Sequence, residues 1–151
     1  MECTRRIKDN LYWIGVNDRR LARFENQFLI PTGISYNAYL WLGEKTVLFD
    51  TTDVRTVKQF TENLQCLLDD RPLDYLIIHH IEPDHGAAIS ELARHFPQMV
   101  LVTTKQGKQM VGQFFSEELK ERCQVVGEGD TLNLGEITLR FFMAPMVHWP
   151  E

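Results

Sequence analysis

The sequence has few cysteines and no long apolar run, and each absence excludes a class of protein. Cys3, Cys66 and Cys123 are an odd number without a C-x-x-C pair, so neither a disulfide framework nor a thiolate metal site is expected. No apolar stretch approaches a membrane span, and the start, Met1 to Arg6, lacks the apolar core of a signal peptide. Reduced cysteines without an export signal predict a cytoplasmic protein.

The sequence also has no excess of positive charge. Its 21 acidic and 16 basic residues give a net charge of −5, which provides no electrostatic attraction for nucleic acid or for an anionic membrane. Neither is therefore expected as a partner. With 151 residues, of which 44% are hydrophobic, the chain has the length of one ordinary domain and enough apolar side chains for a core.

Strand and helix patterns alternate along most of the chain. Helices are expected after Asp53, a plausible N-cap, after the turn at residues 80–85, and around Met110. Strands are expected at residues 11–16, 35–42, 46–50, 75–78, 99–102 and 124–126, followed by two alternating stretches around Leu132 and Leu139. An early hairpin followed by strand–helix alternation predicts an α/β layered domain.

The sequence finishes on a loop, from His148 to Glu151, directly after a strand pattern. No helix pattern follows that would close a domain. We therefore expect residues 1–151 to be the N-terminal part of a larger domain.

Four side chains that can bind metal follow the strand pattern at residues 75–78: His80, Glu82, Asp84 and His85. A strand that ends in His-x-Glu-x-Asp-His must turn sharply, and this turn can direct imidazole and carboxylate groups into one small volume. Such a mixed nitrogen and oxygen set suits iron, manganese or zinc better than copper(I) or an iron–sulfur cluster. Any one of these residues alone would be typical of a polar surface loop, but the four together predict a metal site.

His148 is a fifth candidate ligand, because it follows a second strand pattern and a turn that contains Pro145. The alternative is a partly buried loop histidine beside Trp149. Asp50 ends a strand, and it either begins the following turn or accepts a hydrogen bond from a ligand histidine or the ligand loop. His79 should lie on the opposite face from His80, in a packing or supporting role, because side chains alternate along a strand. His95 is expected at the surface.

The motif His-x-Glu-x-Asp-His with a later strand-end histidine resembles that of the metallo-β-lactamase superfamily. The zinc hydrolases of that fold have histidine where this chain has Glu82. Glutamate at this position resembles the flavodiiron proteins, among them the A-type flavoproteins of anaerobic bacteria, whose two irons reduce O2 or NO. Other segments that resemble this family are Tyr12–Gly15, Asn17–Arg20, Phe24–Asn26, Gly33–Leu40, Val47–Thr51 and Ala144–Glu151. The resemblance extends from about Ile7 to Glu151.

This resemblance implies a metallo-β-lactamase-like αββα sandwich, of which the chain covers the N-terminal half. His80, Glu82 and His148 correspond to ligands of one iron. Asp84 and His85 correspond to ligands of the second, although the histidine matching His85 does not bind metal in every member. The family also has a bridging carboxylate, a last histidine and a flavodoxin-like FMN domain further along, and residues 1–151 include none of these.

The resemblance further implies two non-haem irons as cofactors and FMN as their source of electrons. In the family, FMN comes from the partner subunit of a head-to-tail homodimer, and rubredoxin or a similar carrier is the electron donor. The carboxylate of Glu82 adds negative charge where zinc hydrolases have a neutral imidazole, which favours iron over zinc. O2 and NO would use the same ligands, so the sequence leaves both open as substrates.

Two other functions stay open on the sequence. A zinc-dependent hydrolase of the same fold would use a metal-bound hydroxide to attack an ester or amide, but Glu82 argues against it. A truncated, non-catalytic fragment that binds metal weakly is compatible with the sequence finishing at Glu151. Whether this chain is itself an enzyme is therefore left open.

Overall fold

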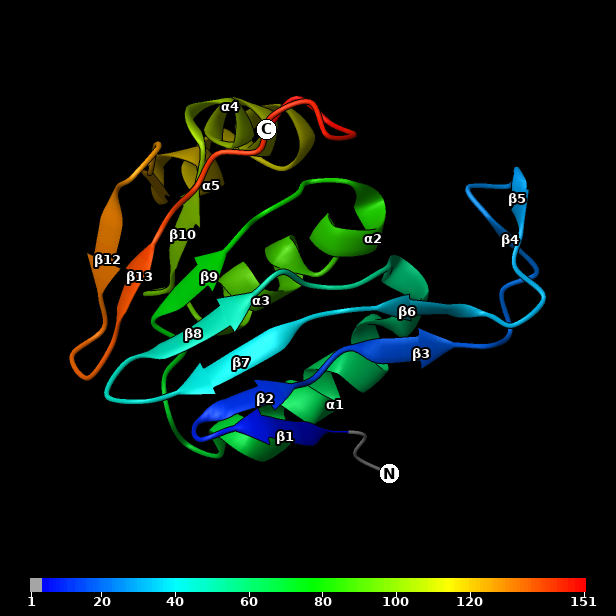
Figure 1. Cartoon of the computed structure of the whole chain (residues 1–151), viewed down its shortest axis with the longest axis horizontal. Coiled ribbons are helices and arrows are strands. Elements are labelled where there is room, and N and C mark those ends of the chain that lie inside the picture. Colours follow the sequence, from blue (N-terminus) through cyan, green and yellow to red (C-terminus); the bar gives the residue numbers. More distant parts are fainter. Residues whose placement is uncertain (1–3) are drawn as a thin grey trace.

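The computed structural model describes residues 4–151, and its centre is a mixed sheet of seven strands (Figure 1). The strands are β1 (Arg5–Lys8), β2 (Leu11–Trp13), β7 (Tyr39–Leu42), β8 (Thr46–Phe49), β9 (Tyr75–Ile77), β10 (Val100–Thr103) and β11 (Cys123–Val125), in this spatial order. Neighbours from β1 to β8 are antiparallel, and neighbours from β8 to β11 are parallel. The α/β layered class predicted from the sequence is confirmed.

The helices that connect the parallel strands cover one face of this sheet (Figure 1). They are η1 (Val54–Thr56), α1 (Val57–Leu68), α2 (Pro83–Gly86), α3 (Ile89–His95), α4 (Lys105–Phe114) and α5 (Glu117–Glu121). Connections between parallel strands are nearly always right-handed, and β8 to β11 follow one another in order, so each connection places its helix on the same side. Phe60, Leu64, Ile89 and Val111 are fully buried in this layer.

The opposite face of the sheet is covered in part by a hairpin of β12 (Thr131–Asn133) and β13 (Thr138–Arg140). Leu134 of this hairpin segment packs with Val47 and Ile77 of the sheet in a second, smaller apolar cluster. Side chains at the border of this cluster are only half-buried. The face of the sheet opposite the helices is therefore partly covered.

Two of the expected strands are interrupted where the chain leaves the main sheet. The expected strand 11–16 is divided into β2 and β3 (Val16–Asp18), and the expected strand 35–42 into β6 (Ile34–Tyr36) and β7. β3 and β6 pair with each other in a separate two-stranded sheet. Gly15 lies at the first break, where an added Cβ would be 2.1 Å from the carbonyl oxygen of Tyr36, so a larger residue would not fit.

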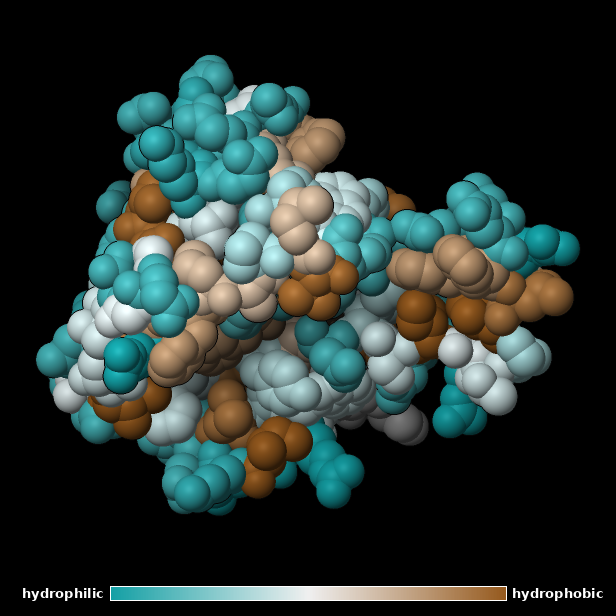
Figure 2. All heavy atoms as spheres, turned by 45° about the horizontal axis from the view of Figure 1, so that its top comes forward, coloured by the Kyte–Doolittle hydropathy of each residue, from teal (hydrophilic) through white to brown (hydrophobic). Residues whose placement is uncertain are grey.

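The segment between β3 and β6, where no helix or strand was expected, contains another hairpin, β4 (Arg23–Phe24) and β5 (Phe28–Leu29), which projects from the body of the molecule (Figure 1). Its strands are too short to give a recognisable alternation in the sequence. Phe28 and Leu29 are 59% and 70% exposed, and apolar side chains are visible on this arm in Figure 2.

Among the described residues, no helix is long and apolar enough to cross a membrane. Cys123 is buried, Cys66 lies exposed on α1, and Cys3 falls outside the described residues.

Asp74 joins β8 and β9 at the end of the sheet opposite the predicted ligand turn. Its carboxylate accepts hydrogen bonds from the backbone N–H of Thr46 at 2.8 Å and from the ammonium of Lys45 at 3.1 Å. Burial by itself would raise the pKa of Asp74, but these hydrogen bonds outweigh it and hold the pKa below its ordinary value of 3.8.

We predict that Asp74→Ala lowers the free energy of unfolding by about 1–3 kcal/mol at neutral pH, because the buried N–H of Thr46 loses its acceptor. A carboxylate with a lowered folded pKa contributes stability above its unfolded pKa and loses it as the pH falls through the folded pKa. Urea unfolding should therefore show the difference shrinking in acid. Asp70→Ala, an exposed substitution on the same connection, is the control. A difference that persists unchanged in acid would contradict the role of the charge.

Candidate metal centre

The predicted ligand turn begins where β9 ends, at the carboxyl edge of the parallel strands. The N–H of Ile78 donates to the carbonyl of Val102 at 2.8 Å, and the chain then leaves the sheet. Pro83 is the first residue of α2, a position where proline is favoured because its missing N–H is not needed there. Glu82 precedes it, and its carbonyl accepts the N–H of His85 at 2.8 Å. This short helix therefore holds the motif in a compact turn.

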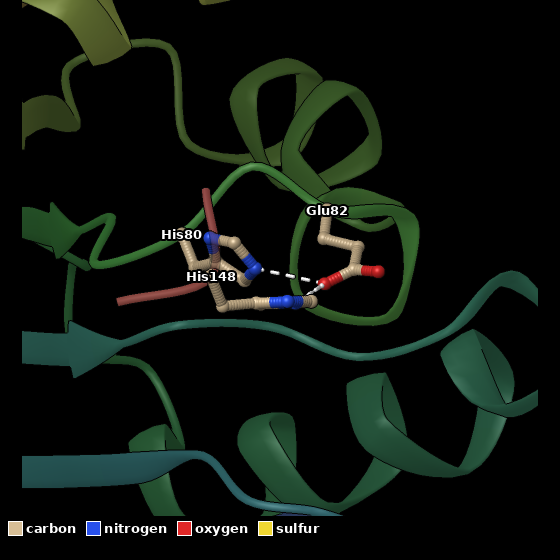
Figure 3. Close-up of side chains that lie close together, drawn as sticks. All are labelled: His80, Glu82 and His148. Carbon is tan, nitrogen blue, oxygen red and sulfur yellow. Dashed lines mark hydrogen bonds and ion pairs between the residues drawn. The ribbon is translucent and has the colours of Figure 1, made fainter. Parts of the chain in front are cut away.

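Three of the five predicted ligands lie together in one group: His80, Glu82 and His148 (Figure 3). One ligand atom of each lies within 4.8 Å of the others. Oε2 of Glu82 is 2.8 Å from Nε2 of His80 and 2.6 Å from Nε2 of His148. The Glu82 side chain is 7% exposed and that of His148 is 61% exposed. The group is thus built on a buried carboxylate and opens to solvent beside His148.

The charges in this group compensate one another. Burial by itself would raise the pKa of Glu82, but hydrogen bonds from His148, Glu25 and His80 outweigh it and lower the pKa. The hydrogen bond to Glu82 raises the pKa of His148 above 6.5. A hydrogen bond to Glu82 also raises the pKa of Glu25, which lies in the turn between β4 and β5. Two imidazoles and a second carboxyl group therefore gather around the carboxylate of Glu82.

Asp84 and His85 lie beside this group but are not members of it. The His85 ring stands edge-on to that of His80, with centroids 5.5 Å apart. Oδ1 of Asp84 and Nδ1 of His85 are buried and have no hydrogen-bond partner in the described chain. Burial raises the pKa of Asp84. Buried polar atoms without partners cost free energy, and these two are of the kinds that bind metals, so they fit a second cation.

Asp50 supports the ligand turn, one of the two roles that the sequence left open. Its carboxylate accepts the backbone N–H of His79 at 2.8 Å and lies 3.0 Å from Nδ1 of the same ring. It also lies 3.8 Å from Nδ1 of His85. His79 stacks on Phe49 and so takes a supporting position, while His95 lies exposed at the end of α3.

Glu151 is a contact of this site that the sequence analysis did not single out. Its side chain is fully buried, and Oε1 lies 2.9 Å from the backbone nitrogen of Ile81 and 3.0 Å from Nδ1 of His80. Residues 80 and 151 are far apart in the sequence, so no local spacing could have indicated the contact.

Comparisons with known proteins show the family of this chain. The family described as ODP family beta lactamase matches residues 34–151. A flavo-diiron protein of Clostridium acetobutylicum is 35% identical over 97% of this chain and 36% of its own length. The anaerobic nitric oxide reductase flavorubredoxin of Vibrio vulnificus is 36% identical over 96% of this chain and 30% of its own length. The chain thus spans about a third of the length of these curated relatives.

Solved structures show the same arrangement of elements. A flavoprotein from Thermotoga maritima is 31% identical, with a TM-score of 0.90 over 99% of this chain and 38% of that one. The rubredoxin:oxygen oxidoreductase of Desulfovibrio gigas is 33% identical, with a TM-score of 0.89 over 98% of this chain and 37% of that one. These likenesses confirm the predicted metallo-β-lactamase-like fold.

We predict that, without metal, the His148 ring titrates above the ordinary histidine value of 6.5, because the Glu82 carboxylate stabilises its charged form. The pairing of charged His148 with Glu82 then contributes its full stability below about pH 6.5. This contribution is lost as the pH rises through the raised pKa of His148. Glu82→Gln should move the pKa of His148 back down, as measured by NMR titration of the ring protons. Glu62→Gln, an exposed change on α1, is the control. Equal pKa values for His148 in wild type and Glu82→Gln would contradict the pairing.

Proposed function

The chain belongs to the ODP beta-lactamase family, and we propose that it is the N-terminal part of the diiron domain of a flavodiiron oxidoreductase. The complete protein would reduce O2 to water or NO to N2O with electrons from FMN in a separate flavodoxin-like domain. Its relatives include a nitric oxide reductase and an oxygen oxidoreductase. Both substrates are therefore kept in the proposal.

The observation that carries the proposal is the convergence of His80, Glu82 and His148 from two distant segments on one small volume. Two imidazole nitrogens and a carboxylate oxygen form a donor set that suits iron. The buried, unpartnered atoms of Asp84 and His85 lie next to it and provide donors for a second iron. A bridging carboxylate from a later part of the protein would complete that second site.

The residues of this chain would have distinct roles. Bound iron would supply the electrons that pass to O2 or NO. His80, Glu82 and His148 would hold the first iron, and the negative charge of Glu82 would stabilise its higher oxidation state. Glu25 lies beside Glu82, and their hydrogen bond raises the pKa of Glu25. Reduction of O2 to water or of NO to N2O consumes protons, and Glu25 is placed to supply one.

We further propose that electrons reach the site from rubredoxin or a similar carrier through FMN. A head-to-tail homodimer would bring the FMN of one subunit to the irons of the other. The name of the Desulfovibrio gigas relative, rubredoxin:oxygen oxidoreductase, supports this donor. A cytoplasmic location stays a prediction from the sequence.

We predict that the full chain, reconstituted anaerobically with Fe(II), binds one iron tightly through His80, Glu82 and His148. Glu82→Gln and His148→Ala should each weaken iron binding by at least on the order of 10–100-fold, which is the usual loss even for a supporting residue. Equilibrium dialysis with iron analysis measures the affinity. His95→Ala, which removes an exposed histidine on α3, should leave it unchanged.

Three results, from this experiment and from activity assays of the same samples, would count against the proposal or against one part of it. Iron affinity that is the same in wild type and His148→Ala would exclude the site. Full occupancy by zinc together with hydrolysis of an ester or amide would favour a zinc hydrolase. Sustained NO consumption by residues 1–151 with reduced flavin would show that the second iron needs no later carboxylate.

A further inference from the structure

We propose that Glu151 is a positioning residue, which holds the His80 ring with Nδ1 protonated and Nε2 available for a metal ion. The inference deepens the proposed function and rests on it, because it takes His80 to be a metal ligand. It also assigns a second role to the loop that carries His148.

The contacts of Glu151 determine which nitrogen of His80 carries the proton. An ionised carboxylate can only accept hydrogen bonds. Because Oε1 of Glu151 lies 3.0 Å from Nδ1 of His80, that nitrogen must be the donor. In a neutral imidazole the other nitrogen, Nε2, then has a lone pair and no proton. Glu151 thereby selects the form of His80 that can bind metal through Nε2.

The opposite side of the His80 ring shows why this selection matters. Nε2 of His80 lies 2.8 Å from Oε2 of Glu82, which is itself an acceptor when ionised. With Nδ1 committed to Glu151, a neutral His80 directs a lone pair at the oxygen of Glu82. Two acceptors at this distance repel each other unless a proton or a metal cation lies between them. The contact with Glu151 thus makes the space between His80 and Glu82 favourable for a cation.

Burial makes the Glu151 contact strong enough for this role. The Glu151 side chain is 0% exposed, and a buried carboxylate is costly unless hydrogen bonds compensate its charge. Only Oε1 receives such hydrogen bonds, from the backbone N–H of Ile81 and from Nδ1 of His80. Oε2 has no hydrogen-bond partner among residues 4–151. Loss of the N–H from His80 would therefore leave Glu151 with a single donor.

The same loop also fixes the plane of the His80 ring. Trp149 packs edge-on against it, with ring centroids 5.2 Å apart and an interplanar angle of 82°. Met146 turns the loop with a positive φ of 60°, and its N–H donates to the carbonyl of Trp149 at 3.0 Å. The loop therefore supplies one ligand, His148, and orients another, His80.

A simpler role for Glu151 is to anchor the loop through the N–H of Ile81. Two substitutions separate the roles. Glu151→Ala removes both hydrogen bonds, whereas Glu151→Gln keeps an amide oxygen that can accept from both N–H groups. Glu118→Ala, which removes an exposed acidic side chain on α5, is the matched control for the change in charge.

The first measurement is the tautomer of His80 in the metal-free full chain, from the ¹⁵N chemical shifts of labelled histidine, with His80→Gln used for assignment. We expect a proton on Nδ1 of His80 in wild type, Glu151→Gln and Glu118→Ala, with or without a further proton on Nε2 toward Glu82, and a growing share of the ring protonated at Nε2 alone in Glu151→Ala. A wild-type ring protonated at Nε2 alone would overturn the inference without any variant, so the inference is testable even if Glu151→Ala fails to fold. An unchanged tautomer in folded Glu151→Ala would overturn it as well.

The second measurement is the affinity for Fe(II) under anaerobic conditions. Loss of a residue that orients a ligand histidine typically costs 10–100-fold in metal affinity, and we expect about that loss in Glu151→Ala. Glu151→Gln should lose less, and Glu118→Ala nothing. Equal affinity of folded Glu151→Ala and wild type would overturn the inference. Failure of wild type to bind iron would instead count against the proposed function, while the tautomer would still decide the role of Glu151.

Discussion

The parallel pairing of β9 with β8 and β10 is the constraint on which the rest of the site depends. Parallel strands direct their carboxyl ends to one edge of the sheet. Here the backbone pairing continues to that edge, where the N–H of Asp50 donates to the carbonyl of Ile77 and the N–H of Ile78 donates to the carbonyl of Val102. Asp50 at the end of β8 and the ligand turn at the end of β9 therefore meet. A different strand order would separate the supporting carboxylate from the turn that it holds.

This arrangement concentrates acidic groups in a poorly hydrated place. Glu82 and Glu151 are buried, and Asp84 lies beside them. Carboxylates this close repel one another and lose hydration, so the turn opposes folding unless positive charge compensates it. Without metal, imidazoles provide this compensation through their hydrogen bonds to Glu82. A metal ion would compensate this negative charge more completely. Metal binding would therefore also stabilise this edge of the sheet.

The partial cover on the second face of the sheet has a consequence for the site. The hairpin of β12 and β13 packs on this face through Leu132 and Leu134. The chain leaves the hairpin at Phe141, whose N–H donates to the backbone carbonyl of Asp130 at 2.9 Å. From this fixed point the chain runs past the edge of the sheet to His148. The burial of a few leucines thus determines where the third ligand of the group lies.

The sequence by itself determined the layered fold, the β7–β8 hairpin and the identity of the ligand turn, because these depend on residues close together in the chain. Local pattern was insufficient at Gly15, where contact with Tyr36 ends a strand, and in the two-residue strands β4 and β5. The resemblance already grouped His148 with His80 and Glu82, but only the tertiary structure gave the distances within this group and showed that Glu151 reaches the ring of His80. Such distances depend on the strand order and packing of the whole sheet, which no local spacing records.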